Sequence, residues 1–308
     1  MKYWSSGPAT SRSSRVTLEF ALHIGTDKEK AMSGAEAVVQ KHYDQAGLLE
    51  SIRQALSDAG KSPERVTVED LVPIDQFHSG GLGTTKALAA KADLRPGQRV
   101  LDVGSGVGGP ARWLAHTFGC HVTGVDLSPV HCEVATELSR WVGLANLNTF
   151  RAGSALALPF PAGSFDRVWT QNVQMNIQDK AGFYGEIARV LAPGGKFAFS
   201  DVVQGPGGTA HYPVVWAMDA SISFLQTPES LRQQLQALGL RELYWEDATA
   251  HYVASRAKQL AASTGDDPRT KLSIEIVVGD RAAERMRNGG RNAEEQRILL
   301  VQGVYEKP

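Results

Sequence analysis

The chain is poor in cysteine, with only Cys120 and Cys132 among its 308 residues. Two thiols do not make a disulfide framework, and neither lies in a C-x-x-C motif or a Cys/His metal spacing. No apolar run approaches the roughly 18 residues that a membrane helix needs. The first 25 residues do not resemble a signal peptide, because Glu19 and His23 interrupt their only apolar stretch. These absences predict a cytoplasmic protein without a metal site or membrane contact.

The chain also lacks an excess of either charge, since Lys plus Arg is 32 and Asp plus Glu is 33. A protein that binds nucleic acid more often has a basic balance or a clustered basic stripe, and neither is visible here. The charge balance therefore favours a partner other than RNA or DNA, without excluding them.

Residues 1–34 have no clear hydrophobic period, and we expect them to form a poorly ordered N-terminal extension. From about 35 to 60, apolar residues recur at steps of three and four, which predicts a helix that ends near Gly60. A short turn, a glycine-containing loop and a helix through Ala90 are expected to follow. Together these segments form a helical region over residues 35–95, distinct from the domain at 96–308.

From Arg99 onward, short apolar strands alternate with helices, which indicates a parallel sheet with helices on both faces. The last strand follows a polar helix and is expected at the sheet edge in the antiparallel sense. Residues 203–227 are too long for a plain connection, so this insertion is expected to carry function. We expect strands near 99–104, 120–126, 147–151, 165–170, 196–202, 241–246 and 297–305, with helices near 108–118, 128–143, 179–191 and 228–238.

A glycine loop joins the first of these strands to its helix in "VLDVGSGVGGPARWLA". Gly104, Gly106 and Gly109 satisfy G-x-G-x-x-G. Glycines allow a tight turn and close approach of the backbone to a ligand, and the helix that follows offers free N–H groups. The motif alone does not separate a bound pyrophosphate from a ligand without phosphate, or from an ordinary glycine turn.

Two acidic residues near the loop narrow the choice. Asp126 ends the second strand, where a carboxylate can accept both ribose hydroxyls of an adenosine. Its alternative role as a helix N-cap suits Ser128 better. Asp102 stands two residues before Gly104, where it faces a cationic group better than a pyrophosphate. No tyrosine has a lysine four residues later, which removes the short-chain dehydrogenases.

The motifs "LDVGSGVGG", "VDLS", "LPF" with "SFD", and "RVLAPGG" follow in order from about residue 99 to 202. Together they resemble the class I S-adenosylmethionine-dependent methyltransferases. "IDQFHSGGLGTTKALA", "GGPARWLA" and "MNIQDKAGFYGEIARVL" look closest to the sarcosine and dimethylglycine N-methyltransferases. The quinone (ubiquinone and menaquinone) and tocopherol C-methyltransferases are more distantly similar. The resemblance implies a Rossmann-like α/β fold with a seven-stranded, mostly parallel sheet, an antiparallel last strand and an N-terminal helical lid.

The same resemblance implies S-adenosylmethionine as the cofactor and a set of residues around it. Gln76 would close over its methionine end, Gly104 and Gln171 would hold its amino group, and Ser154 would lie at the adenine edge. Many relatives carry an acid where Ser154 stands and a histidine where Asn172 stands. The full predicted set is Gln76, Asp102, Gly104, Ser105, Gly106, Asp126, Leu127, Ser154, Ala155 and Gln171.

Methyl transfer is an in-line displacement, and positioning the two reactants can supply roughly 7–11 kcal/mol of the barrier. An amine acceptor must be neutral, so a positioned base can be needed. His78 is the first candidate for this base, with His211 and Tyr212 as alternatives, although His78 also fits simple packing against the lid. For the acceptor pocket we expect residues that equally suit core packing: Met175, Asn176, Trp216 and Phe224.

The sequence thus predicts a methyltransferase for a small-molecule acceptor, preferably an amine nitrogen, in a monomer or homodimer. Carbon and oxygen acceptors remain open. A methyltransferase of RNA or protein would want a basic groove. The nucleic-acid amine methylases also carry an Asn/Asp-Pro-Pro-aromatic motif where "TQNVQMNI" stands. A non-catalytic partner is the third alternative, disfavoured by the intact Asp102, Gly104 and Asp126.

Overall fold

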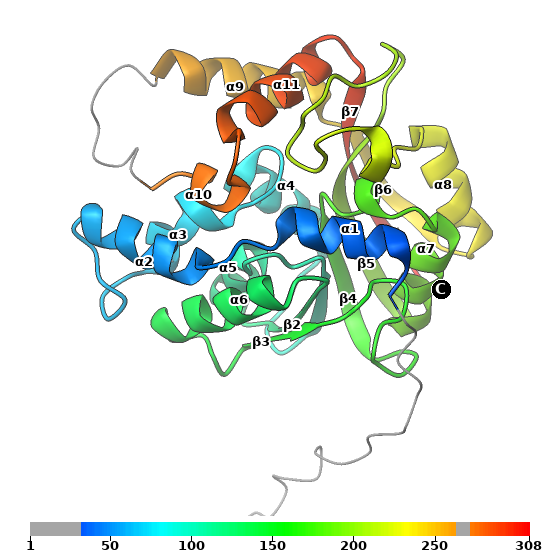
Figure 1. Ribbon diagram of the computed structural model, residues 1–308. Helices are drawn as coiled ribbons and strands as arrows, with labels where there is room; N and C mark the ends of the chain where they lie inside the picture. The colour runs from blue at the N-terminus through cyan, green and yellow to red at the C-terminus, as the bar shows by residue number, and fades with distance from the viewer. Residues whose placement is uncertain (1–31, 263–271) are drawn as a thin grey trace, which may run out of the picture. The chain divides into compact units, whose positions relative to one another are not determined.

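A seven-stranded sheet forms the centre of the computed structural model, which describes residues 32–262 and 272–308 (Figure 1). The expected N-terminal extension falls outside the described residues, except for 32–34. The strand order is β3-β2-β1-β4-β5-β7-β6. The strands are β1 (Arg99–Val103), β2 (His121–Asp126), β3 (Asn148–Ala152), β4 (Phe165–Gln171), β5 (Leu191–Gln204), β6 (Arg241–Asp247) and β7 (Ile298–Glu306).

The first five strands run parallel, and β7 runs antiparallel to both of its neighbours. The prediction that the last strand lies at the sheet edge is wrong, because β7 lies between β5 and β6. Its burial explains this position. Side chains from Leu300 to Tyr305 are buried on both faces of the strand, as in a central strand. Strand β6 alternates between exposed and half-buried residues and forms the edge instead.

Helices cover both faces of the sheet and the region beyond its strand ends (Figure 1). The helices are α1 (Gly34–Tyr43), α2 (Leu48–Asp58), α3 (Val68–Asp75), α4 (Gly81–Ala92), α5 (Gly109–Phe118), α6 (Pro129–Trp141), α7 (Lys180–Val190), α8 (Pro228–Ala237), α9 (Thr249–Ala262), α10 (Glu275–Val278) and α11 (Ala282–Glu294). Two short 3₁₀ helices, η1 (Gln174–Asn176) and η2 (Ala220–Ile222), follow β4 and β5.

Two apolar cores hold these layers together. On one face, Leu88 of α4 and Leu114 of α5 pack with Trp169 of the sheet. On the other, Phe183 of α7 and Leu231 of α8 pack with further strand residues. Burying each large apolar side chain contributes about 1.5–3 kcal/mol, so the helices are fixed mainly by their sheet-facing stripes.

The N-terminal helical region differs in detail from its prediction. The single helix expected over 35–60 is split into α1 and α2, because Gly47 adopts a left-handed conformation (φ 76°) at the start of α2. The expected turn before the glycine loop also contains helix α3, which Thr67 and Asp70 begin with a reciprocal capping box. Leu48, Ile52 and other apolar residues of this region pack with α10 and α6 in a third core.

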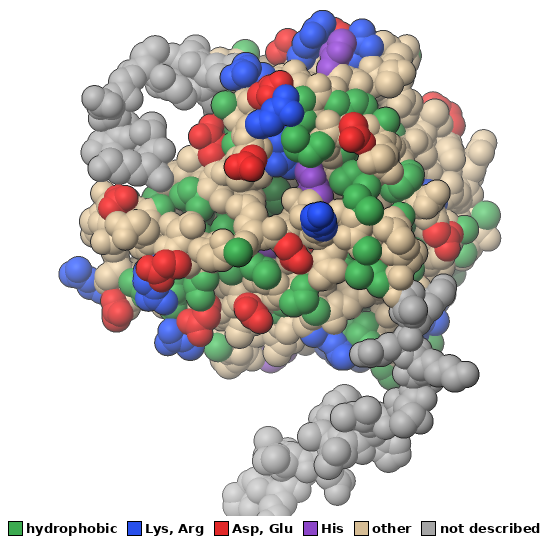
Figure 2. All heavy atoms as spheres, in the orientation of Figure 1, with side chains coloured by type: hydrophobic (Ala, Val, Ile, Leu, Met, Phe, Trp, Pro, Cys, Tyr) green, Lys and Arg blue, Asp and Glu red, His purple; other side chains and the backbone are tan. Residues whose placement is uncertain are grey.

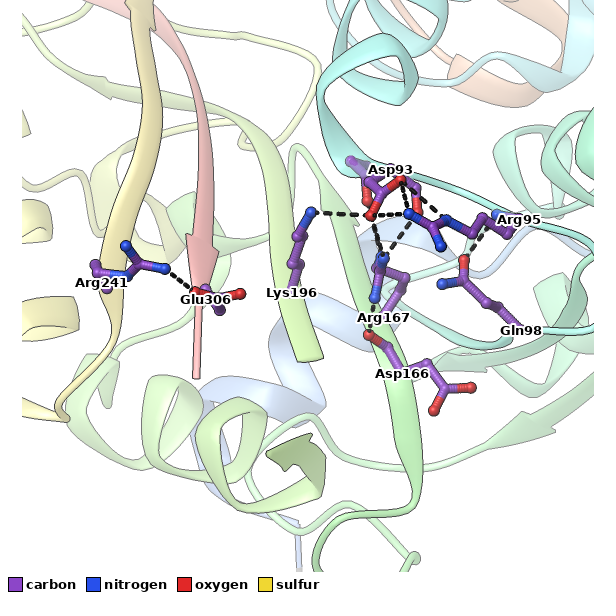
Figure 3. A network of polar contacts seen from close by, with 9 residues as sticks. Asp93, Arg95, Gln98, Asp166, Arg167, Lys196, Arg241 and Glu306 are labelled. Atoms are coloured by element: carbon purple, nitrogen blue, oxygen red, sulfur yellow. Dashed lines mark hydrogen bonds and ion pairs between the residues drawn. The ribbon is translucent and has the colours of Figure 1, made fainter. Parts of the chain in front are cut away.

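A polar network closes the amino-terminal ends of the strands (Figure 3). Asp93, just after α4, contacts Arg95, Arg167 and Lys196, with Nζ of Lys196 3.2 Å from its carboxylate. The hydrogen bond from Lys196, followed by that from Arg95, lowers the pKa of Asp93. This carboxylate therefore ties the end of α4 to β4 and β5.

Candidate functional site

A cavity of about 670 Å³ lies at the carboxyl ends of β1, β2 and β4. Open α/β sheets bind their ligands at this edge. Residues of α1, α3, the glycine loop and the loop after β4 line the cavity. Residues of α9, α10, α11 and β7 line it as well. The cavity therefore lies between the N-terminal helices and the last part of the chain.

Close contacts explain two glycines of the loop. Gly104 has φ 72°, and a Cβ built on it would lie 2.4 Å from Cγ2 of Val173. A Cβ on Gly109 would lie 2.0 Å from the carbonyl oxygen of Asp75. The end of α3 therefore packs directly on the start of α5, so α3 covers this part of the glycine loop.

Asp126 is anchored by backbone donors at the end of β2. Its Oδ2 accepts the Gly106 N–H at 2.8 Å, and its Oδ1 accepts the Ser128 N–H at 2.9 Å. Burial alone would raise the pKa of Asp126, but the contact with His131 and these two N–H donors hold it below the usual value. Ser128 caps α6 as expected, accepting the His131 N–H. Asp126 is thus an ionised, fixed carboxylate in the cavity wall.

Asp102 has the opposite environment. It is 2 % exposed, and its Oδ2 is buried without a hydrogen-bond partner among the described residues. Burial, reinforced by the charge of Asp126, raises the pKa of Asp102 to about 8. A buried carboxyl without a partner is unfavourable unless a ligand supplies one. Because Asp102 lines the cavity, the arrangement fits a cation such as a sulfonium or ammonium group and opposes a pyrophosphate.

His78 lies in the cavity wall within a polar network. Its Nε2 is 3.0 Å from Oγ1 of Thr85 and 3.2 Å from Oε1 of Gln76, and its Nδ1 is 3.3 Å from Nε2 of Gln171. Burial lowers the pKa of His78 to about 4. Both ring nitrogens are therefore engaged by protein groups, and the geometry argues against His78 as a general base. It fits better as a support for Gln76 and Gln171, which also line the cavity.

The expected adenine edge has a contact that the sequence did not reveal. Ser154 donates a hydrogen bond to the Glu36 carboxylate of α1. Ala155 and Glu36 line the cavity, whereas Ser154 itself lies behind them. Ser105 and Leu127 also line it, and the Ser105 hydroxyl is buried without a partner in the described structure. The Glu36 carboxylate of α1 is therefore held next to the predicted adenine edge.

The residues predicted for the acceptor pocket, together with the alternative bases His211 and Tyr212, divide into two groups. Met175, Asn176 and Trp216 line the cavity. Asn176 donates to the carbonyl oxygens of Trp216 and Ile222, which fixes the insertion onto η1. The other three predicted residues, His211, Tyr212 and Phe224, do not line it.

These three positions are corrections to the predicted site. The backbone N–H of His211 donates to Oδ1 of Asn292 on α11, and its Nε2 lies 2.9 Å from Glu295 Oε2. This contact turns the His211 ring toward α11 and away from the cavity. Tyr212 packs into an apolar cluster with Trp216, and the backbone of Phe224 bonds to Met175. Neither His211 nor Tyr212 is therefore placed to act as a base.

Sequence reasoning missed the contributions of three helices. Tyr43 of α1 and His131 of α6 line the cavity, and Nε2 of His131 is buried without a partner in the described structure. On α9, Tyr252, Ser255 and Arg256 also line it. Their spacing of three and four residues places them on one helix face. This spacing alone does not reveal which part of the protein that helix face contacts.

The charges on the surface do not indicate a particular kind of partner. Figure 2 shows acidic and basic side chains of the described residues interspersed on one face, with neither sign forming a continuous patch. Among the described helices, none combines the length and the hydrophobicity that crossing a bilayer requires.

Comparisons with known proteins identify relatives of this chain. A family model described as "Methyltransferase domain" matches residues 101–199. The glycine/sarcosine/dimethylglycine N-methyltransferase of Actinopolyspora halophila is 32% identical over 212 residues, which cover 65% of this chain and 37% of that protein. The sarcosine/dimethylglycine N-methyltransferase of Halorhodospira halochloris is 32% identical over 203 residues, which cover 64% of this chain and 69% of that protein. The chain thus spans little more than a third of the first relative.

A solved structure gives the same fold. Phosphoethanolamine N-methyltransferase 2 of Haemonchus contortus, in complex with S-adenosyl-L-methionine, has a TM-score of 0.63 at 19% identity. The match covers 91% of this chain and 61% of that chain. Three observations agree on the family. They are the sheet topology, the buried Asp102 carboxyl without a described partner, and the relationship over more than two thirds of the Halorhodospira protein. The chain belongs to the class I S-adenosylmethionine-dependent methyltransferases, whose cofactor is S-adenosylmethionine.

Proposed function

We propose that this chain transfers a methyl group from S-adenosylmethionine to a small-molecule acceptor, preferably an amine nitrogen. The observation that carries the proposal is the buried Asp102 carboxyl, which has no described partner and lines the cavity together with the anchored Asp126. This pair fits a cation attached to an adenosine. The names of the two N-methyltransferase relatives support an amine acceptor.

The residues that would hold the cofactor follow from their chemistry. Asp126 would accept its ribose hydroxyls, since its Oδ2 keeps a free lone pair beside the Gly106 N–H donor. Asp102 would face its cationic end, and Gln171 would hold its amino group. When bound, S-adenosylmethionine would supply a methyl group that its sulfonium already activates for displacement.

The protein's own residues would then orient the acceptor and exclude water. Asn176 accepts a hydrogen bond from the Tyr43 hydroxyl and donates one to the Trp216 carbonyl oxygen. This chain of contacts closes the wall between the lid and the insertion. Positioning of the reactants in such an enclosed site is the main catalytic contribution that the geometry supports.

Carbon or oxygen acceptors form the second candidate. The cavity wall near the insertion is apolar, and His78, His211 and Tyr212 do not offer a free base there. A carbon or oxygen acceptor that enters the cavity uncharged would suit such an apolar wall, although its methylation also releases a proton. The alternatives of an RNA or protein substrate, or of a non-catalytic partner, have no comparable feature in their favour. A cytoplasmic monomer or homodimer completes the proposal.

An acceptor screen with radiolabelled S-adenosylmethionine tests this function. Amines, phenols and activated carbon acceptors would be offered in parallel, together with bulk RNA and protein. Labelled amines support the proposal, and labelled phenols or carbon acids favour the second candidate. Binding of S-adenosylmethionine in calorimetry with no labelled product would support a non-catalytic partner. Label in RNA alone would overturn the small-molecule assignment.

A further inference from the structure

Arg256 stands out among the residues that line the cavity. It is the only Lys or Arg among the described lining residues. The described lining residues also include four acids, namely Glu36, Asp75, Asp102 and Asp126. Asp75 is neutralised by its ion pair with Arg112. The three others lie along α1, β1 and β2, so the positive charge of Arg256 comes from a different part of the wall.

The Arg256 side chain is held by packing and not by an acidic partner. A Cβ built on Gly290 of α11 would lie 2.1 Å from its Nε, so the side chain crosses from α9 against the bare backbone of α11. Among the described residues its Nε is buried without a hydrogen-bond partner, and no ion pair joins Arg256 to any of them. The residue as a whole is half-buried, and a buried N–H without a partner is costly. An anion bound in the cavity would remove that cost.

The surroundings of Arg256 link it to the predicted acceptor residues. Tyr252, one helical turn earlier, packs in the same apolar cluster as Met175 and Trp216. Helix α9 packs against α11 and β7, whose residues Ile298 and Leu300 belong to that cluster and also line the cavity. The helix that carries Arg256 therefore shares an apolar part of the wall with the predicted acceptor residues.

A second cation, Arg285, lies close to the cavity wall. Arg285 of α11 is buried and donates to the carbonyl oxygens of Val214 and Val278, with His42 beside it. Val278 lines the cavity, so Arg285 lies just behind the wall. The cavity wall thus carries acids on α1, β1 and β2 and a cation on α9, with Arg285 just behind it.

We propose that the acceptor is an amphipathic acid, whose carboxylate or phosphate pairs with Arg256 while its apolar body packs against Trp216 and β7. The inference rests on the proposed function, because it assigns Asp102 and Asp126 to the cofactor. The cofactor also carries a carboxylate, which is the other source of the same chemistry. The position of Arg256 beside the acceptor wall favours the acceptor.

The test measures binding of decanoate and of its neutral analogue decanamide to the full chain saturated with S-adenosylhomocysteine, by calorimetry. We expect decanoate to bind about tenfold more tightly than decanamide, as for a hydrogen bond to a charged group. Arg256→Gln should abolish this preference, and Arg256→Lys should retain part of it. Lys258→Gln, an exposed cation on the same helix, is the matched control and should change nothing.

Two results would overturn the proposal. One is equal affinity, or no affinity, of the unaltered protein for the acid and the amide. The other is loss of S-adenosylhomocysteine affinity in Arg256→Gln with the acid preference intact, which would assign Arg256 to the cofactor's carboxylate. A protein that binds no S-adenosylhomocysteine refutes the proposed function instead. The acid and amide comparison on the ligand-free protein then still decides the role of Arg256.

Discussion

The Tyr43 hydroxyl donates a 2.9 Å hydrogen bond to Oδ1 of Asn176, a residue 133 positions further along the chain. It joins α1 to the wall that follows β4. Glu36 contacts Ser154, and Asp44 contacts Ser128, so the same helix and its end are tied to the sheet by further side-chain bonds. Only Val39 of α1 is buried. A helix held mainly by polar contacts opens more readily than one held by a core.

The first prediction concerns this lid. If residues 40–80 close over the cofactor, S-adenosylhomocysteine should slow tryptic cleavage within that segment. Tyr43→Phe removes one hydrogen bond worth about 1 kcal/mol, so cleavage of the complex should be about fivefold faster. Tyr244→Phe on β6, outside the cavity, serves as the control. Equal cleavage of the unaltered protein with and without ligand would leave this region as a fixed appendage.

The second prediction concerns Asp126. Asp126→Ala should weaken binding of S-adenosylmethionine by about 1.5–3 kcal/mol, the range for hydrogen bonds to a charged group. Calorimetry gives the affinity, and a thermal melt checks that the loop anchored at Gly106 still folds. Asp58→Asn, at the exposed end of α2, is a suitable control. Tight binding of NADH without any binding of S-adenosylmethionine would contradict the site assignment.

The third prediction is a pH dependence that originates at Asp102. Its pKa is raised to about 8 in the folded chain, so between about pH 4 and 8 the folded state binds a proton that the unfolded state lacks. Its contribution to stability therefore falls as pH rises through this window. Asp102→Asn should raise the melting temperature more at pH 8 than at pH 5.

The same carboxyl should couple cofactor binding to pH. A cation beside Asp102 favours its ionised form, so binding should release a proton and tighten from pH 6 to 8. Calorimetry in buffers of different ionisation enthalpy measures the proton. Asp102→Asn retains the titration of the ligand but should lose this release. An identical pH profile in both proteins would show that Asp102 does not face the cation.

The fourth prediction separates acceptor contact from packing at Trp216. The side chain is 3 % exposed, and its Nε1 donates to Ser223, so Trp216→Ala would also open a cavity costing about 3–5 kcal/mol. Trp216→Phe is the milder change. It should lower kcat/KM for the acceptor much more than the affinity for S-adenosylhomocysteine. Trp245→Phe, which packs on Phe199 outside the cavity, provides the comparison. Equal loss of both quantities would assign Trp216 to the core.

The fifth prediction concerns the buried pair of Asp75 and Arg112, whose atoms Oδ2 and Nη2 lie 2.9 Å apart. Asp75→Leu should destabilise the fold by about 3–5 kcal/mol in urea unfolding, because it leaves the Arg112 charge buried. The double variant with Arg112→Met should recover much of that loss. Asp93→Asn, at a more exposed carboxylate, should cost only about 0–1 kcal/mol for each pair it breaks. No recovery in the double variant would show that packing, not charge, is lost.

The sequence predicted the strands closely, because each is a short apolar run bounded by turn residues. It also predicted the positions of Asp102 and Asp126 in the fold, because these depend only on the strand that carries each residue. It did not predict that β7 enters the sheet interior, since burial on both faces depends on which neighbours are present. It likewise missed Glu36 and Arg256. Their approach to the cavity depends on how α1 and α9 pack, and side-chain type at helical spacing does not encode that.

The interior position of β7 sets an order of events during synthesis. Strands β5 and β6 are made before residues 298–306, yet neither pairs with the other. Until β7 leaves the ribosome, β5 and β6 each expose an unpaired edge, and such edges invite aggregation. The first four strands can assemble earlier, with the glycine loop and Asp126 in place. We therefore expect the nascent chain to become competent for the cofactor before Ile298 and Leu300 complete the wall for the acceptor.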